Sequence, residues 1–329
     1  MRVSLIIGLI LLCVFSAVSI SAQVDWVQIG SDIEGEGGSD AFGYSIALSG
    51  DGSIMAIGAI YNDGNGADSG HVRVFENQSG IWLQIGSDID GEATDDFNGC
   101  SVSLSDDGSI LAVGAIQNDG NGIDSGHVRV YENQMGNWVQ IGQSINGEAA
   151  GDRFGWSVSL SSDGNVLAVG ATQNDGNGVD SGHVRVFENL SGNWIQIGAD
   201  IDGPHFDANF GFSVSISDNG NILAIGSPNY GLPFFNDSGL VRVFENQFGN
   251  WIQVGDDIEG DAQGDESGFS VSLSSDGSVV AIGAPKNSDA GVFAGQVRIF
   301  ENSAGTWTQI GSDIDGDVGT EQSGCAIAL

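Results

Sequence analysis

The chain has 329 residues, with 44 acidic against 8 basic side chains and a formal net charge of −36. Nucleic-acid binders neutralise phosphates with Lys and Arg, so this balance argues against nucleic acid and against docking on anionic lipid. With 40% hydrophobic residues the acidic chain can still fold, and its 3 cysteines are too few for a disulfide scaffold. The length fits two ordinary domains or one large all-β domain.

Residues 1–22 have the three-part plan of a secretory signal peptide. Arg2 supplies the basic start, an apolar run extends from Leu5 to Val14, and small residues lead to Ala22. We expect cleavage after Ala22 and a secreted or cell-surface protein. An uncleaved anchor helix and lipid attachment at Cys13 are the alternatives. No second apolar run follows, so we expect no membrane insertion after cleavage.

Residues 25–329 repeat one pattern with a period of 56 or 57 residues. Tryptophans at 26, 82, 138, 194, 251 and 307 each open a W-x-Q-I/V-G phrase. Three other phrases recur in fixed order, namely F-G-x-S, an apolar A-I/V-G run after Asp-Gly, and V-R-V/I-F/Y-E-N. Self-similarity at a fixed period of this size is typical of a repeat architecture.

Each repeat predicts four short strands. Ser101–Ser105 alternates polar and apolar residues, and an Asp-Gly hairpin signal leads to the continuous apolar run Ile110–Val113. After a glycine-rich loop, His127–Tyr131 alternates again, and a turn leads to Trp138–Ile141. Four antiparallel strands per repeat indicate an all-β fold, a β-propeller of four-stranded blades with the serine-rich strand nearest the axis. A β-helix is the alternative.

The F-G-x-S phrase, followed by a V-G-A strand and a G-x-V-x-V-F/Y strand, resembles the FG-GAP repeats of exported bacterial proteins over residues 25–329. It is more distantly similar to the propeller of integrin α subunits. The literal Gly-Ala-Pro tripeptide occurs at 283–285. Integrin blades carry an Asp-rich calcium loop between their first two strands. Here a tight S-x-D-G-x turn stands in that place, so the integrin metal site does not transfer.

The predicted strands do not close a ring. Residues 23–329 begin with a fourth strand, Trp26–Ile29, and end within a first strand, Cys325–Leu329. This gives five full blades plus partial blades at both ends, whereas propellers close on themselves to remove exposed edges. We expect one FG-GAP-like propeller domain that is incomplete at its C-terminus. An open arc and closure through a partner chain are the alternatives.

The loop between the second and third strands is the candidate metal site. Its N-D-G-N-G-x-D-S-G sequence spaces side-chain oxygens so that they could wrap a hard cation, and Ca²⁺ is the one cofactor that the sequence suggests. A metal-free loop of Asx turns is the alternative. The candidate ligands are Asp63, Asn65, Asp68, Asp119, Asn121, Asp124, Asp175, Asn177 and Asp180.

The third strand carries one arginine per blade, as at Arg129. A buried guanidinium must be paired, so we expect an ion pair with a blade carboxylate such as Glu132 or with an Asp of the preceding loop. The histidines at 71, 127 and 183 share one register, which Leu240 and Gln296 occupy in later blades. A position that accepts His, Leu and Gln is interpreted as packing surface.

Cys100 and Cys325 both occupy the x of F-G-x-S, which is aromatic in the other repeats. Equivalent positions on different blades are too far apart for a disulfide. We therefore interpret both cysteines as buried apolar substitutes for an aromatic side chain.

No catalytic residues are expected, because no acid–base pair or nucleophile breaks the repeat. The sequence predicts a non-enzymatic exported or cell-surface propeller that binds an extracellular protein or glycan. A calcium-dependent carbohydrate- or matrix-binding protein is the alternative, and an enzyme is a distant third. The largest break in the repeat, at 228–237, contains Tyr230, Phe234 and Phe235, which we expect to contact the ligand. A loop folded onto its own blade is the other interpretation.

Overall fold

The computed structural model describes residues 27–231 and 237–329. The predicted signal peptide, Phe234 and Phe235 therefore lie outside the described residues. Every regular element in the described part of the chain is a β-strand, and no helix there is long and apolar enough to cross a bilayer.

The strands form five antiparallel sheets that follow one another in the chain. The first sheet contains β1 (Phe42–Leu48), β2 (Ile54–Ala59), β3 (His71–Gln78), β4 (Ile81–Gln84) and β5 (Ile89–Asp90). The second contains β6 (Asn98–Leu104), β7 (Ile110–Ala115), β8 (His127–Gln134), β9 (Asn137–Gln140) and β10 (Ile145–Asn146). The third contains β11 (Phe154–Leu160), β12 (Val166–Ala171), β13 (His183–Asn189), β14 (Trp194–Gln196) and β15 (Ile201–Asp202).

The last two sheets follow the same plan. The fourth contains β16 (Ser213–Ile216), β17 (Ile222–Ser227), β18 (Leu240–Gln247), β19 (Asn250–Gln253) and β20 (Ile258–Glu259). The fifth contains β21 (Ser270–Leu273), β22 (Val279–Ala284), β23 (Gln296–Ser303), β24 (Thr306–Gln309) and β25 (Ile314–Asp315).

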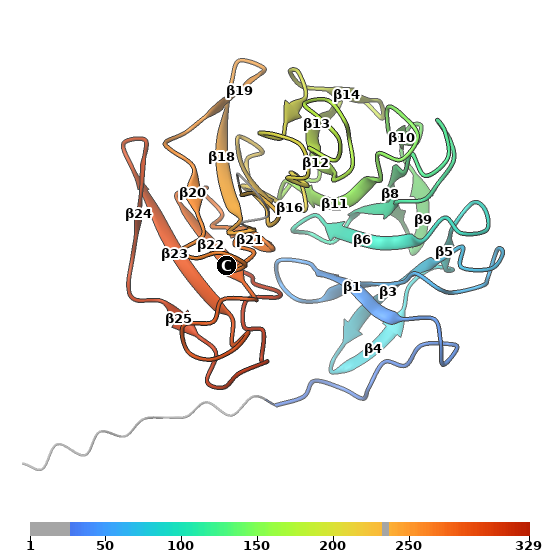
Figure 1. Ribbon diagram of the computed structural model, residues 1–329. Coiled ribbons are helices and arrows are strands. Elements are labelled where there is room, and N and C mark those ends of the chain that lie inside the picture. The colour runs from blue at the N-terminus through green and yellow to red at the C-terminus, as the bar shows by residue number, and fades with distance from the viewer. Residues whose placement is uncertain (1–26, 232–236) are drawn as a thin grey trace, which may run out of the picture.

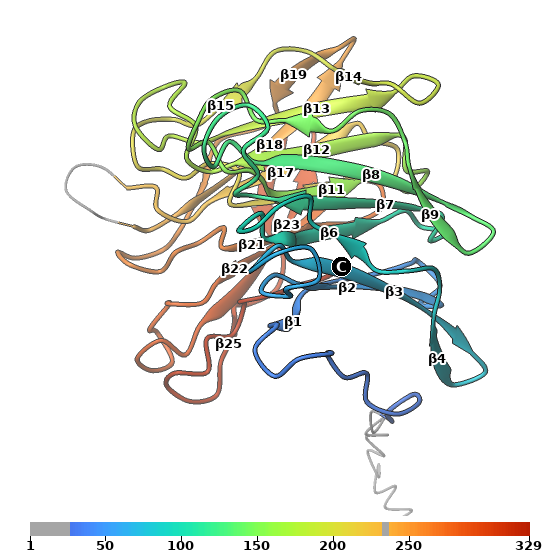
Figure 2. The same ribbon diagram turned by 90° about the vertical axis from the view of Figure 1, so that its right-hand side faces the viewer.

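In each sheet the first four strands pair in chain order. A fifth strand of two residues also pairs with the third strand, on the same edge as the fourth strand. The sequence did not predict this fifth strand. The five sheets stand around a common centre, with the first strands innermost and the fourth strands outermost (Figure 1). In the view turned by 90°, the third strands β3, β8 and β13 follow one another in chain order (Figure 2). The predicted all-β propeller is thereby confirmed.

Small residues allow the inner strands of neighbouring blades to approach closely. A Cβ atom added to Gly58 in β2 would lie 2.1 Å from the carbonyl oxygen of Gly99 in the next blade. Ser45 Oγ donates a hydrogen bond of 2.7 Å to that same oxygen. The contact recurs from Ser157 to Gly211, also at 2.7 Å. The serines of the first strand thus hydrogen-bond to the next blade at a point where the two blades lie very close together.

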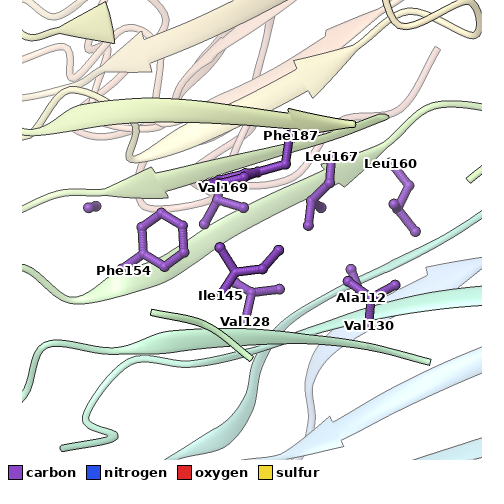
Figure 3. Close-up of a cluster of buried hydrophobic side chains, with 10 residues drawn as sticks. Ala112, Val128, Val130, Ile145, Phe154, Leu160, Leu167, Val169 and Phe187 are labelled. Carbon is purple, nitrogen blue, oxygen red and sulfur yellow. The ribbon is translucent and has the colours of Figure 1, made fainter. Parts of the chain in front are cut away.

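The hydrophobic core lies between blades. Ala112, Val128 and Val130 of the second sheet pack against Phe154 and Leu167 of the third (Figure 3). Each large side chain buried in this way contributes about 1.5–3 kcal/mol. The apolar face of each blade is thus buried by the face of its neighbour.

Candidate metal centre

One face of the third strand carries a histidine, an arginine and an aromatic residue in the first three sheets. His71, Arg73 and Phe75 in β3 are an example, because residues at i, i+2 and i+4 of a strand share a face. Arg129 in β8 shows where this face points. Its Nη2 donates hydrogen bonds to Asp90 O, in β5 of the first sheet, and to Asn98 Oδ1, at the start of β6. The face therefore lies against the boundary with the preceding blade.

Two of these histidines meet two carboxylates each. Glu36, His71 and Asp88 place one potential ligand atom each within 4.8 Å of one another. Glu148, His183 and Asp200 do the same in the third sheet. His71 Nδ1 lies 3.9 Å from Asp88 Oδ2, which is too far for a hydrogen bond and leaves room between the two atoms.

Neighbouring glutamines orient the two aspartates. Gln84 Nε2 donates to Asp88 Oδ1 at 2.6 Å, and Gln196 Nε2 donates to Asp200 Oδ1 at 2.7 Å. One oxygen of each carboxylate is thus held by the blade, and in the first sheet the other oxygen faces the imidazole. Hydrogen bonds of this kind orient ligands at metal sites.

The imidazoles of both clusters are buried. His71 and His183 are each 1% exposed, and the Nε2 atom of each has no hydrogen-bond partner among the described residues. Burial, and then the charge of Arg185, lower the pKa of His183 to about 4. A neutral imidazole keeps its lone pair available, as metal ligation requires.

An arginine lies beside each cluster. Arg185 Nη1 is 3.6 Å from Glu148 Oε1, and Arg73 Nε is 3.9 Å from Asp88 Oδ1. Partial burial raises the pKa of Glu148, and the charge of Arg185 opposes that shift. In the third sheet, two carboxylates, one guanidinium and the neutral imidazole of His183 leave a net charge of −1, which favours a divalent cation.

The other sheets lack at least one member of the cluster. In the second sheet His127 lies 3.8 Å from Glu92, but Ser144 stands where the first and third sheets have an aspartate. In the fourth and fifth sheets Leu240 and Gln296 replace the histidine. Among the described residues, the complete set is therefore confined to the first and third sheets.

The arginines are paired, but not with the predicted glutamate. Arg129 Nη1 lies 3.8 Å from Glu92, in the segment between β5 and β6. Glu132 is three residues further along β8, so strand alternation turns it to the opposite face. Arg298 pairs with Asp261 at 2.6 Å, and Asp261 occupies the same position in its repeat as Glu92 does in the earlier one. The partner thus comes from the segment between blades in the second and fifth sheets, whereas in the fourth sheet Arg242 pairs at 2.8 Å with Asp257, just before β20 of the same sheet.

The interpretation of the histidines as packing surface describes their burial but misses their carboxylate neighbours. Sequence reasoning overlooked Glu36, Asp88, Glu148 and Asp200. The sequence does contain a signal for these residues, namely a fixed spacing. A Glu stands 35 positions before, and an Asp 17 positions after, both His71 and His183. β5 and β15 return to the start of the third strand and bring Asp88 and Asp200 beside the histidines, whereas Glu36 and Glu148 come from the segments before β1 and β11.

The predicted calcium loops use their side chains within the fold. Asp63 Oδ1 accepts the backbone N–H of Asp68 at 2.9 Å, and Asp68 adopts a positive φ of 50°. Asn65 Nδ2 donates to Gly91 O at 2.8 Å, which ties the loop to the segment between blades. The same bonds recur at Asp119, Asn121, Asp124, Asp175, Asn177 and Asp180. Calcium binding at these loops stays a prediction.

Of the predicted ligand-contacting aromatics, only Tyr230 lies in the described residues. Its ring lies 5.0 Å from the ring of His205, with an angle of 31° between the planes. His205 belongs to the segment between β15 and β16, so Tyr230 is packed across a blade boundary. Its role in ligand contact stays a prediction.

The x positions of F-G-x-S surround a cavity at the axis. The cavity has a volume of about 240 Å³ and is lined by Tyr44, Cys100, Ile116, Trp156, Phe212 and Phe269. Cys100 is buried as predicted, and burial raises its pKa to about 12. Cys325 is exposed, contrary to the prediction, because no described blade follows it. Both thiols are free.

The fold is a β-propeller of repeated four-stranded blades, and the first three repeats match a known family model. The FG-GAP repeat model matches residues 34–75, 87–131 and 146–187. The chain thus contains FG-GAP repeats, which confirms the resemblance seen in the sequence. A search among curated proteins found no match.

Three solved structures are similar to this chain at low sequence identity, and two of them have TM-scores above 0.5. Periplasmic gluconolactonase from Pseudomonas aeruginosa is 18% identical, with a TM-score of 0.54 over 82% of this chain and 71% of that chain. A candidate 6-phosphogluconolactonase from Bacteroides uniformis is 11% identical, with a TM-score of 0.51 over 84% and 87%. Hydrazine synthase from Kuenenia stuttgartiensis is 16% identical, with a TM-score of 0.49 over 78% of this chain. The chain spans 64% of that protein.

These neighbours contradict the prediction of a non-enzymatic binding propeller and its carbohydrate- or matrix-binding alternative. Two proteins with this fold are named for lactone hydrolysis, so the fold hosts enzymes. The error came from equating repeat symmetry with a lack of chemistry, since a repeated set of side chains can still form a reactive centre. At these identities the likeness shows the fold alone. The predicted protein or glycan partner stays a prediction.

Proposed function

We propose that this protein is a divalent-metal-dependent hydrolase that opens an ester or lactone bond at its Glu–His–Asp centres. The observation that carries the proposal is the convergence of Glu148, His183 and Asp200 within 4.8 Å. The same constellation at Glu36, His71 and Asp88 supports it. Three protein ligands leave coordination positions open, which is typical of catalytic rather than structural zinc sites.

The donor set fits a first-row divalent ion. One imidazole nitrogen and two carboxylate oxygens suit Zn²⁺ and its neighbours, which bind such ligands at about 2.0–2.2 Å. The exposed Glu148 can rotate towards the fixed His183 and Asp200 to bring the ligand atoms closer together. Such an ion would act as a Lewis acid and lower the pKa of a water molecule at the centre.

The chemistry needs only water as co-reactant. Water adds to the carbonyl carbon, the bond to the leaving oxygen breaks, and that oxygen takes the second proton of the water. The product is a hydroxy acid from a lactone, or an acid and an alcohol from an ester, with no change in oxidation state. Arg185, 3.6 Å from Glu148, would stabilise the negative charge that develops on the carbonyl oxygen.

The fold and the sequence are consistent with this activity outside the cytoplasm. One neighbour in fold is named a periplasmic gluconolactonase. Residues 1–22 have the pattern of a signal peptide, and FG-GAP repeats resemble those of exported proteins. The likeness in fold makes a lactone a reasonable first substrate to try, and the choice of ester or lactone follows from the assay.

The test uses the full chain, stripped of metal with a chelator and reloaded with Zn²⁺ or Mn²⁺. We expect hydrolysis of gluconolactone or p-nitrophenyl acetate to require the ion. The double variant His71→Leu/His183→Leu should then lose at least 100-fold in activity. His127→Leu is the matched control, because it makes the same change in a sheet without the aspartate. Activity that survives metal removal, or that falls equally in the control, would refute the proposal.

A further inference from the structure

Three loops hold the chain segment between blades in the same way. In the loop between β7 and β8, Asn121 Nδ2 donates hydrogen bonds to Gly147 O at 2.9 Å and to Glu148 O at 2.8 Å. Asn65 and Asn177, at the equivalent positions of the first and third sheets, donate to the corresponding two carbonyl oxygens. Each asparagine thus fixes the main chain where it passes from one blade to the next.

The three loops differ in the residue that they hold. Asn121 holds Glu148, a member of the complete Glu–His–Asp centre in the third sheet. Asn65 holds Glu92 instead, and the second sheet lacks the aspartate that would complete its centre. The third of these loops holds a proline, which offers no side-chain ligand. Of the three asparagines, Asn121 alone therefore acts on a complete centre.

Both peptide groups that flank the Cα atom of Glu148 are held. Asn121 binds the carbonyl oxygen of each. The N–H of Ala149 donates at 2.9 Å to Oδ2 of Asp152, a carboxylate whose residue is 3% exposed. Asn174 Nδ2 donates to the same oxygen at 3.2 Å, which fixes the carboxylate in turn. The main chain at Glu148 is thus ordered by side chains from two neighbouring loops.

The side chain of Glu148 is much freer than its main chain. It is 45% exposed, and its Oε1 lies 3.6 Å from Arg185 Nη1. An exposed glutamate can adopt many rotamers, so the position of its Cα atom decides whether its oxygens can reach His183 and Asp200. A ligand whose main chain is already ordered also loses less conformational entropy when a metal binds. The hydrogen bonds of Asn121 therefore favour metal binding at this centre.

We propose that Asn121 is a positioning residue for the third-sheet centre, where it raises the affinity for a divalent cation by fixing the main chain of Glu148. The inference rests on the proposed function, because it concerns the same centre. Asn121 acts through Glu148 and does not itself contact the ion. Loss of a group that orients a metal ligand typically costs about 10–100-fold in metal affinity. A loop of the second sheet thus serves the centre of the third.

The experiment uses the full chain with His71→Leu, which removes the first-sheet centre and leaves the third-sheet centre as the complete set. Calorimetric titration of the metal-stripped protein with Zn²⁺ should give one site. Asn121→Ala should weaken Zn²⁺ binding at that site by about 10–100-fold. Asn65→Ala is the matched control, because it removes the same two hydrogen bonds from the segment that contains Glu92. It should leave the Zn²⁺ affinity unchanged.

A second pair of variants separates positioning from charge. Aspartate has the shape of asparagine but no N–H group to donate, and its negative charge alone would attract a cation. Asn121→Asp should nevertheless weaken Zn²⁺ binding, because the carboxylate would face two carbonyl oxygens and release the segment. Asn65→Asp adds the same charge in the equivalent loop and should not weaken binding. The expected sign is thus opposite to that of a simple electrostatic effect.

The possible outcomes separate this inference from the proposed function. Zn²⁺ binding that is unchanged or tighter in Asn121→Ala and Asn121→Asp would overturn the inference alone, since the parent chain would still bind the ion. Equal weakening in the Asn65 and Asn121 variants would also overturn it, because the cause would then be general loss of loop structure. Failure of the His71→Leu chain itself to bind Zn²⁺ would refute the proposed function and the inference together.

Discussion

Protonation of His127 should limit the stability of this fold in acid. Burial, and then the charge of Arg129, lower the pKa of His127 to about 3. Glu92 lies 3.8 Å away, but it is half exposed and water screens its charge. The unfolded chain keeps an ordinary histidine pKa of about 6.5, so it binds more protons than the folded state between these values. Stability is therefore present above about pH 6.5 and falls as the pH is lowered.

The magnitude follows from the two pKa values. Between pH 7.5 and 4.5 the shift removes about 2–3 kcal/mol of unfolding free energy for this one histidine. His127→Leu should abolish that part of the loss, because leucine does not titrate and Leu240 fills the same register in the fourth sheet without exposure. His127 is the cleanest choice, since its sheet lacks the aspartate of the metal centres.

Urea unfolding at pH 7.5 and 4.5, at matched ionic strength, measures the effect. The loss of stability on acidification should be smaller in His127→Leu than in the wild type by about 2–3 kcal/mol. Equal losses in the two proteins would refute the reasoning, because they would mean that the buried imidazole titrates as it does in the unfolded chain.

Three further predictions concern stability. Asp257→Asn should cost about 1.5–3 kcal/mol at pH 7 in urea unfolding, since Arg242 donates two hydrogen bonds to this carboxylate. Arg242 also lowers the pKa of Asp257, so the difference from wild type should vanish only when the pH falls below that lowered pKa. Gly170→Ala should cost about 1–3 kcal/mol or more, because the added Cβ would lie 2.1 Å from Gly211 O, and a melting temperature equal to wild type would contradict this. The melting temperature should rise with NaCl, and a further rise in Ca²⁺ at matched ionic strength would support the calcium loops, whereas equal melting would exclude them.

The fold was predictable from the sequence because each level of its pattern points the same way. The alternation in Ser101–Ser105, the apolar run at Ile110–Val113 and the fixed period predict strands, their order and the blade. The fifth strand was missed, because a pair such as Ile89–Asp90 is too short to show periodicity.

The candidate site was not predictable in the same way. Its ligands are 17 to 52 positions apart in sequence and meet only when one blade packs against the chain that enters it. The pairing of Arg129 with Glu92 rather than Glu132 was also missed. Strand alternation indicates the face on which a residue lies, but not which other segment of the chain covers that face. Burial of Cys325 failed as a prediction because the blade that would cover it is not among the described residues.

Metal stoichiometry tests the Glu–His–Asp centres most directly. Calorimetric titration of the metal-stripped chain with Zn²⁺ should give two sites in the wild type and none in His71→Leu/His183→Leu. Ser144→Asp should create a third site, because it completes the set of Glu92 and His127 beside Gln140, which already lies within 3.5 Å of Ser144 Oγ. No binding by the wild type, unchanged binding in the double variant, or two sites in Ser144→Asp would contradict the assignment.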